Sequence, residues 1–197
     1  MVRPGAFGDR APVAALLAAA FQNDPAMVFI YPDAEIRRAR LPALFAILHD
    51  SDVARGVCLV TRGGEAATLW RAPGTAQGGW REKLAEAVPL LRALGPALGR
   101  ALAYSAASDA NHPAEPHWYL HIAGCAPQAQ GRGHGRNVVR AGLDRADADG
   151  VPAYLETSTE RNIGYYQSFG FTVTHDWRVR GSLQTWSMLR PVPAKAE

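Results

Sequence analysis

Cysteine is scarce in this sequence, and its scarcity excludes two common ways of stabilising a small protein. Two cysteines, Cys58 and Cys125, stand among 197 residues, and neither lies in a metal-binding spacing. The sequence therefore predicts neither a disulfide framework nor a metal site. Free thiols fit a reducing compartment, so we expect a cytoplasmic protein.

Long apolar runs and long basic runs are missing as well. No apolar stretch approaches the roughly 20 residues that span a bilayer. Asp9 and Arg10 interrupt the apolar start of the chain, which argues against a signal peptide. The net charge of +3 is too weak to indicate nucleic acid, but it suits a small polyanionic ligand. We expect neither a membrane nor a nucleic-acid partner.

The residues that are present predict one packed domain. The chain is 48% hydrophobic and 20% charged, which supports a substantial core. Hydrophobic periodicity predicts an α/β fold with a mixed sheet. The domain should cover residues 1–190, followed by a loose tail at 191–197. Helices are expected at 9–21, 34–50, 80–103 (interrupted near Gly95), 137–149 and 161–169, and strands at 2–7, 56–62, 65–70, 117–126, 152–158, 171–179 and 183–189.

Three other segments are expected to be irregular. Residues 22–33 are apolar but bounded by prolines, so they form either a packed connector or the wall of a pocket. Residues 71–79 are predicted to form a loop. Residues 106–116 are polar and contain proline, which indicates a connection over the surface.

The most informative stretch is a glycine-rich loop between a strand and a helix. Gly131, Gly133 and Gly135 stand at alternate positions, where each would cost a helix about 1 kcal/mol relative to alanine. Glycine there lets the backbone approach a ligand closely, and the helix start presents free N–H groups and a positive dipole end. The loop therefore predicts an anion site, most often for phosphate. Its spacing fits neither the G-x-G-x-x-G fingerprint nor a P-loop.

Two motifs carry a resemblance to a known family. Gln130-x-x-Gly133-x-Gly135 resembles the Q/R-x-x-G-x-G/A signature of the GCN5-related N-acetyltransferase (GNAT) superfamily. Further along, Asn162-x-x-x-Tyr166-x-x-x-Gly170-Phe171 is similar to that family's last helix. The stretches EPHWYL, PAYLETS, NIGYYQSFGFTVT and TWSM resemble the branch that includes puromycin N-acetyltransferase. The likeness covers nearly the whole chain and is strongest after Glu115.

This resemblance implies a fold and a co-substrate. The implied sheet is mixed, mostly antiparallel and flanked by helices, and it splays where strand 117–126 leaves strand 152–158. The co-substrate would be acetyl-CoA, held by a core at about 115–175. The implied cofactor residues are Ala123, Gly124 and Cys125 for the pantetheine, Gln130, Gly131, Arg132, Gly133, His134, Gly135 and Arg136 for the pyrophosphate, and Asn162 and Tyr166 on the last helix. The family often has an asparagine where this chain has Thr159, and Asn162 is the expected substitute.

Acetyl transfer to an amine also sets chemical requirements. An alkylammonium with a pKa near 10.4 must lose a proton, and the leaving thiolate benefits from an acid. Tyr166 falls on the family's acid, with Tyr165 as its neighbour and competitor. His121, on one strand face with His117 and Tyr119, and Glu156 are the candidate bases; ordered water is the alternative. Direct transfer is expected rather than an acyl-Cys125 intermediate.

The identity of the acceptor substrate is what the sequence indicates least clearly. We expect a primary amine of a small molecule, contacted by one carboxylate and an aromatic wall: Asp24, Tyr31, Trp70, Trp118 and Trp186. Acetylation of a protein N-terminus or lysine is the alternative. A non-catalytic acyl-CoA-binding module is a further one, and it predicts no role for Tyr166. The sequence leaves both a monomer and a homodimer open.

Overall fold

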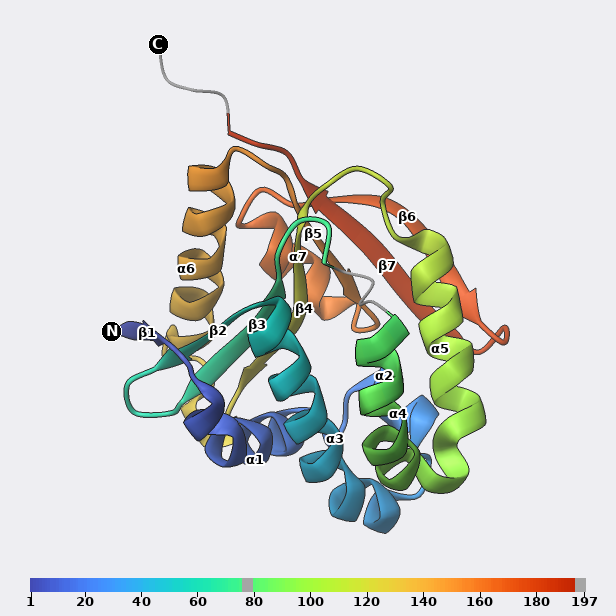
Figure 1. Cartoon of the computed structure of the whole chain (residues 1–197). Helices are drawn as coiled ribbons and strands as arrows, with labels where there is room; N and C mark the ends of the chain where they lie inside the picture. The colour runs from blue at the N-terminus through green and yellow to red at the C-terminus, as the bar shows by residue number, and fades with distance from the viewer. Residues whose placement is uncertain (76–79, 194–197) are drawn as a thin grey trace.

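A single mixed sheet organises the protein (Figure 1). The computed structural model describes residues 1–75 and 80–193, with the backbone alone for residues 80–86. Within these residues seven strands lie in the order β1-β2-β3-β4-β5-β7-β6. The strands are β1 (Val2–Pro4), β2 (Gly56–Thr61), β3 (Ala66–Arg71), β4 (Trp118–Cys125), β5 (Ala153–Thr157), β6 (Thr172–Val179) and β7 (Leu183–Arg190).

The sheet opens between β4 and β5, its one parallel pair among the described strands. These strands pair only from Trp118↔Ala153 to Leu120↔Leu155. Beyond Leu120, β4 remains paired with β3 as far as Cys125, so its other edge diverges from β5. All other neighbouring strands are antiparallel. The predicted fold class, a mostly antiparallel sheet splayed at this pair, is confirmed.

Helices cover both faces of the sheet (Figure 1). One buried cluster lies beneath α1, α2 and α3, and a second lies beneath α6 and α7. The helices are α1 (Arg10–Ala20), α2 (Pro25–Ile30), α3 (Ala34–Arg55), α4 (Trp80–Leu94), α5 (Leu98–Asn111), α6 (His134–Asp149) and α7 (Arg161–Gln167), with short 3-10 turns at Phe7–Asp9, Gly95–Ala97 and Pro127–Ala129. Within the same residues no helix is both long and apolar enough to cross a membrane.

The segment expected to be an irregular loop at 22–33 contains a helix. Asp24 caps α2, because its Oδ1 accepts hydrogen bonds from the backbone N–H groups of Ala26 and Met27 at 2.9 and 3.2 Å. Pro25 occupies the first helical position, where a missing N–H costs nothing. The Asp-Pro pair thus starts a helix here rather than breaking one.

Several other predicted boundaries are also wrong. The second predicted helix runs beyond residue 50 to Arg55, and the predicted connection at 106–116 is helical as far as Asn111. The helix after the glycine loop begins at His134 rather than at residue 137, and the first strand already ends at Pro4. The predicted interruption near Gly95 is confirmed. Parts of the predicted loop 71–79 and tail 191–197 lie outside the described residues; residues 191–193 have no regular structure.

Candidate active site

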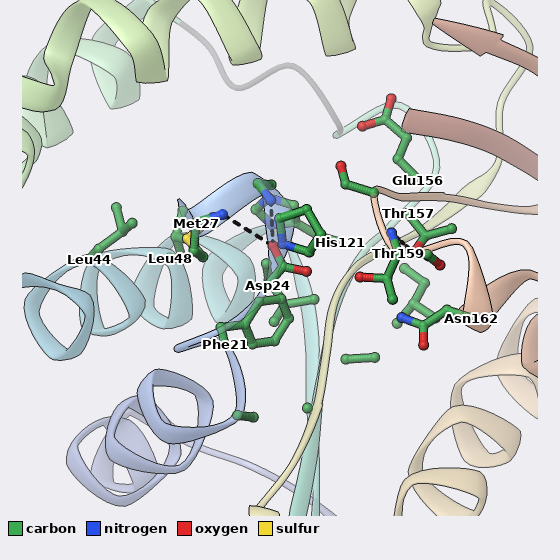
Figure 2. Close-up of a pocket in the computed structure, with 18 of the residues that line it drawn as sticks. Phe21, Asp24, Met27, Leu44, Leu48, His121, Glu156, Thr157, Thr159 and Asn162 are labelled. Atoms are coloured by element: carbon green, nitrogen blue, oxygen red, sulfur yellow. Dashed lines mark hydrogen bonds between the residues drawn. The ribbon is translucent and has the colours of Figure 1, made fainter. Parts of the chain in front are cut away.

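A cavity of about 1640 Å³ opens where β4 and β5 separate. Drug-sized pockets typically occupy about 300–1,000 Å³, so this one has room for two ligands side by side. Its walls come from the glycine loop, both diverging strands, and helices α1, α2, α3, α4, α5 and α7. Figure 2 shows residues from both sides of the opening, with Asp24 and His121 facing Thr159 and Asn162.

The glycine loop forms one end of this cavity. Gly131 and Gly133 have φ values of 75° and 82°, in the left-handed region that other residues rarely adopt. Gly133 is the N-cap of α6 and no described side chain caps the helix, so the first turn presents backbone N–H groups to a ligand, although that of Gly135 contacts the Cys125 thiol. A Cβ built at either glycine meets nothing within 4 Å. The loop is therefore an open cradle at the positive end of a 16-residue helix, which fits a pyrophosphate.

Most residues implied as cofactor contacts line this cavity: Ala123, Gly124, Cys125, Gln130, Gly131, Gly133, His134, Gly135, Arg136, Asn162 and Tyr166. Arg132 is exposed and is not among its described lining residues. The guanidinium of Arg136 lies 4.9 Å above the ring of Phe169, and its Nη1 donates to Ser168 Oγ at 3.1 Å.

Gly124 has a packing reason of its own. A Cβ built there would lie 2.6 Å from Cδ2 of Leu17, so the close approach at this position is that of α1 to β4. The absence of a side chain at Gly124 is therefore needed for the packing of α1 against β4.

The two adjacent tyrosines of α7 occupy different surroundings. Tyr166 is buried in the cluster beneath α6 and α7, and burial raises its pKa well above the ordinary value. Tyr165 is 36% exposed, and its hydroxyl lies 3.5 Å from a Cβ built at Gly135, beside the glycine loop. Both line the cavity. Tyr166 is thus kept protonated among apolar side chains, whereas Tyr165 borders the anion cradle.

His121 is held by a buried carboxylate that the sequence did not indicate. Its Nδ1 lies 2.6 Å from Oδ2 of Asp52, whose Oδ1 accepts from Nε of Arg71 at 2.7 Å. Asp52 is fully buried; burial opposes its charge, but His121 and Arg71 lower its pKa overall. Nδ1 must then carry the proton of a neutral His121, so Nε2 keeps its lone pair. Burial, followed by the charge of Arg71, lowers the pKa of His121, which favours that neutral form.

Strand β4 carries an irregularity at this histidine. Leu69 pairs with Ile122 while the next residue, Trp70, pairs with Leu120, so His121 is the extra residue of a bulge. Bulges bend a strand and redirect a side chain, and they are frequent beside active sites. The ring of His121 still lies 5.3 Å from that of Tyr119, on the face expected from alternation.

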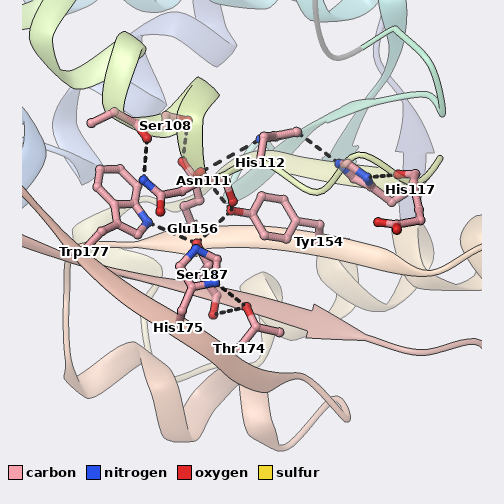
Figure 3. Close-up of polar contacts among 12 residues, drawn as sticks. Ser108, Asn111, His112, His117, Tyr154, Glu156, Thr174, His175, Trp177 and Ser187 are labelled. Carbon is pink, nitrogen blue, oxygen red and sulfur yellow. Dashed lines mark hydrogen bonds and ion pairs between the residues drawn. The ribbon is translucent and has the colours of Figure 1, made fainter.

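Glu156 is fixed by donors on both carboxylate oxygens (Figure 3). Ser108 Oγ donates to Oε2 at 2.7 Å, and the Tyr154 hydroxyl donates to Oε1 at 2.9 Å. The Tyr154 oxygen is in turn 2.9 Å from Ser187 Oγ, which accepts from the indole N–H of Trp177. Hydrogen bonds in such a chain polarise one another. Glu156 is therefore a fixed negative charge at the cavity wall.

Two histidines lie near Glu156 (Figure 3), and one of them, His112, also lines the cavity. His117 Nδ1 is 2.7 Å from the carbonyl of Glu115, which can only accept, so this nitrogen carries a proton. Burial lowers the pKa of His117, and its neutral Nε2 then accepts from Nε2 of His112 at 3.0 Å. Nδ1 of His112 therefore faces Glu156 Oε1, 3.9 Å away. A proton on that nitrogen would pair with the carboxylate.

The predicted aromatic wall requires correction. Tyr31 is buried and its hydroxyl donates to the carbonyl of Ala93; Trp70 is buried against α6, where Gly142 leaves room for its indole. Trp118 is buried with its N–H donated to Asp149, and Trp186 is half-buried on β7. These four are absent from the described lining of the cavity, because large aromatics contribute most when buried in a core.

Asp24 does line the cavity, but its neighbours there are mainly aliphatic. They come from α2, α3, α4 and α5: Met27, Ile30, Leu44, Ile47, Leu48, Ala87, Leu90, Leu91, Leu94, Leu98, Ala101 and Leu102. Residues 22–33 thus contribute to a pocket wall, one of the two alternatives predicted for them, although the helix α2 within them was not predicted. Asp52 was not predicted as a site residue, although position 52 follows Leu41, Leu44 and Leu48 at helical spacing and so points inward.

Comparisons with known proteins agree with this geometry. The model of the Acetyltransferase (GNAT) family matches residues 71–171, and the chain belongs to this family. It is 25% identical over 174 residues to an uncharacterized N-acetyltransferase of Schizosaccharomyces pombe, covering 83% of this chain and 70% of that protein.

The solved structures that share the fold include two acetyltransferases. One, described as histone acetyltransferase HPA2 and related acetyltransferase from Corynebacterium glutamicum, has a TM-score of 0.70 and 22% identity, with 100% of this chain and 98% of that chain covered. The Drosophila melanogaster polyamine N-acetyltransferase has a TM-score of 0.60 and 17% identity, with coverage of 96% and 97%.

Proposed function

We propose that the protein is an acetyl-CoA-dependent N-acetyltransferase that transfers the acetyl group directly to a primary amine of a small molecule. One observation carries the proposal: the open glycine cradle and the edge of β4 that no described strand pairs with beyond Leu120 border the same cavity as His121 and Glu156. The cradle suits the pyrophosphate and the strand edge suits the amide groups of the pantetheine. The free thiols of Cys58 and Cys125 suit the reducing cytoplasm that we propose as its location.

The chain's own groups suit the proton transfers of this reaction. We assign His121 as the base, because Asp52 holds Nδ1 and leaves Nε2 as an acceptor. The amine nitrogen then attacks the thioester carbonyl, the C–S bond breaks, and Tyr166 donates a proton to the thiolate sulfur. Glu156, already accepting on both oxygens, is better suited to attract the incoming ammonium than to take its proton.

A small-molecule acceptor is favoured over a protein. The two structural neighbours are described as acting on a histone in one case and on polyamines in the other, so the fold is compatible with both classes. The acceptor side of this cavity lies between helices and is mainly aliphatic, whereas a lysine-bearing or N-terminal peptide would favour an open acidic groove. The narrower resemblance to the puromycin enzyme remains a prediction and does not fix the acceptor.

Ligand-induced stabilisation tests the proposal. At a hundredfold excess over Kd, acetyl-CoA should stabilise the fold by about 2.7 kcal/mol. Each kcal/mol shifts the Tm of a chain of this size by about 2–4 °C. Acetyl-pantetheine, which lacks the pyrophosphate, should give a much smaller shift. Thiol release in the presence of primary amines then measures turnover. Absence of any shift with millimolar acetyl-CoA would refute the proposal.

A further inference from the structure

The acceptor side of the cavity has a polar end and an apolar end. The polar end holds Glu156 and Asp109, the latter of which follows the Ser108 that donates to Glu156. The apolar end is lined by leucines of three helices, Leu44 and Leu48 of α3, Leu91 of α4, and Leu98 and Leu102 of α5. A ligand that matches both ends is amphipathic, with a cation at one end and a hydrocarbon at the other.

Asp24 lies where the two ends meet. Its Oδ1 accepts from two backbone N–H groups at the start of α2, while no described residue donates to Oδ2. In Figure 2 Asp24 stands between Leu44 and Leu48 on one side and Thr159 and Asn162 on the other. A carboxylate oxygen in this position, beside aliphatic side chains, is a partner for a ligand cation.

We propose that the acceptor is a primary alkylamine, its ammonium between Asp24 and Glu156 and its aliphatic chain along the leucines of α3, α4 and α5. This inference rests on the proposed N-acetyltransferase function and names its substrate class. The size of the cavity supports it, since about 1640 Å³ leaves room for such a chain beside the pantetheine arm.

Other occupants match the same walls less well. A polyamine would place its second ammonium among leucines, far from the acidic end, where burying it without a partner is costly. An arylalkylamine finds few aromatic partners, because the described aromatic residues of the cavity outside α7 are Phe21, Tyr104 and Tyr119. A long acyl chain on the CoA would fill the apolar end but would leave Asp24 facing no cation.

A series of amines tests the proposal on the full-length protein with acetyl-CoA. Thiol release gives kcat/KM for butylamine, hexylamine and octylamine, for 1,8-diaminooctane of the same length, and for tryptamine. Each buried methylene should raise kcat/KM about fourfold, so octylamine, with four more methylenes, should exceed butylamine by roughly 250-fold. The diamine and tryptamine should fall well below octylamine. Acetyl-CoA and octanoyl-CoA are compared with butylamine as acceptor, and acetyl-CoA should be preferred.

A matched pair of variants locates the chain-binding wall. Leu91 and Val88 are both about half exposed on α4, at 49% and 55%, but only Leu91 lines the cavity. In Leu91→Gln the dependence of kcat/KM on chain length should flatten, and adding Leu102→Gln should flatten it further, several-fold in all. In Val88→Gln it should be unchanged. All of these variants should retain the Tm shift with acetyl-CoA, which controls for folding.

The outcomes separate this inference from the proposed function. If acetyl-CoA gives no shift and no amine releases thiol, the proposed function fails. If acetyl-CoA binds and short amines react as well as long ones, or the diamine matches octylamine, the alkylamine assignment alone is overturned. If octanoyl-CoA is preferred over acetyl-CoA and the rate does not depend on amine length, the apolar end binds the acyl chain of the CoA donor instead.

Discussion

His121 is the residue on which the chemistry of the cavity most depends. Its neutral form, with Nδ1–H donated to Asp52, is the one that can accept a proton from an ammonium. Replacing it in His121→Gln should lower kcat by about 10²-fold or more, the usual contribution of a positioned base. The defect should shrink at high pH, where a growing fraction of the amine is already deprotonated. Steady-state kinetics from pH 6 to about 10 measure both effects.

A second histidine of the same strand region provides the control. His117 is buried and bonded to Glu115 and His112, and it is not among the described residues that line the cavity. His117→Gln should therefore change kcat little once folding is verified. In the native protein the acidic limb of the kcat profile should lie below about pH 6.5, since burial lowers the pKa of His121 and the histidine loses its acceptor nitrogen only below that pKa. Equal losses in both variants would contradict the assignment.

The adjacent tyrosines of α7 allow an equally direct test. Burial raises the pKa of Tyr166, so its hydroxyl stays protonated and can donate to a leaving thiolate. Tyr166→Phe should lower kcat by at least about tenfold, at the low end for a proton donor, with little change in the KM for acetyl-CoA. Tyr165→Phe should chiefly raise that KM, because its hydroxyl borders Gly135. A fully active Tyr166→Phe protein would favour the non-catalytic binding module.

Residue roles divide into those that local spacing reveals and those that it does not. Local spacing reveals the glycine loop, with Gln130, Gly133 and Gly135, and the last helix, with Tyr166 and Gly170. These residues line the cavity or shape its walls, because a glycine cradle and a helix each require fixed sequence intervals. Asp52 is joined to His121 across 69 residues, and no interval reveals such a contact. The aromatic residues were misplaced because core packing and ligand binding favour the same side chains.

At the scale of elements, the differences between the predicted and the observed structure lie mainly at helix ends. Asp24 and Pro25 begin α2, and polar residues near its end conceal the last turn of α3, where Asp52 is buried. Both elements contribute to the acceptor wall, in agreement with the second of the two alternatives predicted for residues 22–33, the wall of a pocket. The glycine loop and the order of strands were predictable because turns and hydrophobic periodicity are local properties.

The two ends of α6 offer a test of the glycine cradle with a built-in control. Gly133 and Gly150 both adopt left-handed backbone, with φ of 82° and 67°, and a Cβ at either meets nothing within 4 Å. Alanine at each should therefore cost a similar strain of about 1–2 kcal/mol. Only Gly133→Ala should also raise the Kd for acetyl-CoA, because Gly150 ends the helix away from the cavity. Thermal unfolding and calorimetric titration distinguish the two effects; similar Kd changes in both variants would show that the cradle is not the anion site.

For the molecule as a whole, the splayed sheet is what brings both ligands together. The two halves of the sheet are joined by β4 and β5, which pair over only three residues each. Beyond these pairs the two strands diverge and open one cavity, which is lined by both the glycine loop and the acceptor wall. Neither half contains the site alone: His121 and Asp52 come from the half before the opening, and Glu156 and Tyr166 from the half after it. The acceptor and the acetyl donor can then be bound at the same time, which makes direct transfer feasible.

Simultaneous binding predicts a kinetic pattern. Initial rates measured against amine at several acetyl-CoA concentrations should give intersecting double-reciprocal lines, as expected when both substrates are bound before product leaves. Cys125 lines the cavity, but burial raises the pKa of its thiol, so little nucleophilic thiolate forms near neutral pH. Cys125→Ala should therefore keep kcat within about threefold of the native value, well short of the loss that removing a covalent nucleophile causes. Parallel lines, together with an inactive Cys125→Ala protein and a burst of CoA release without amine, would instead require an acyl-cysteine intermediate.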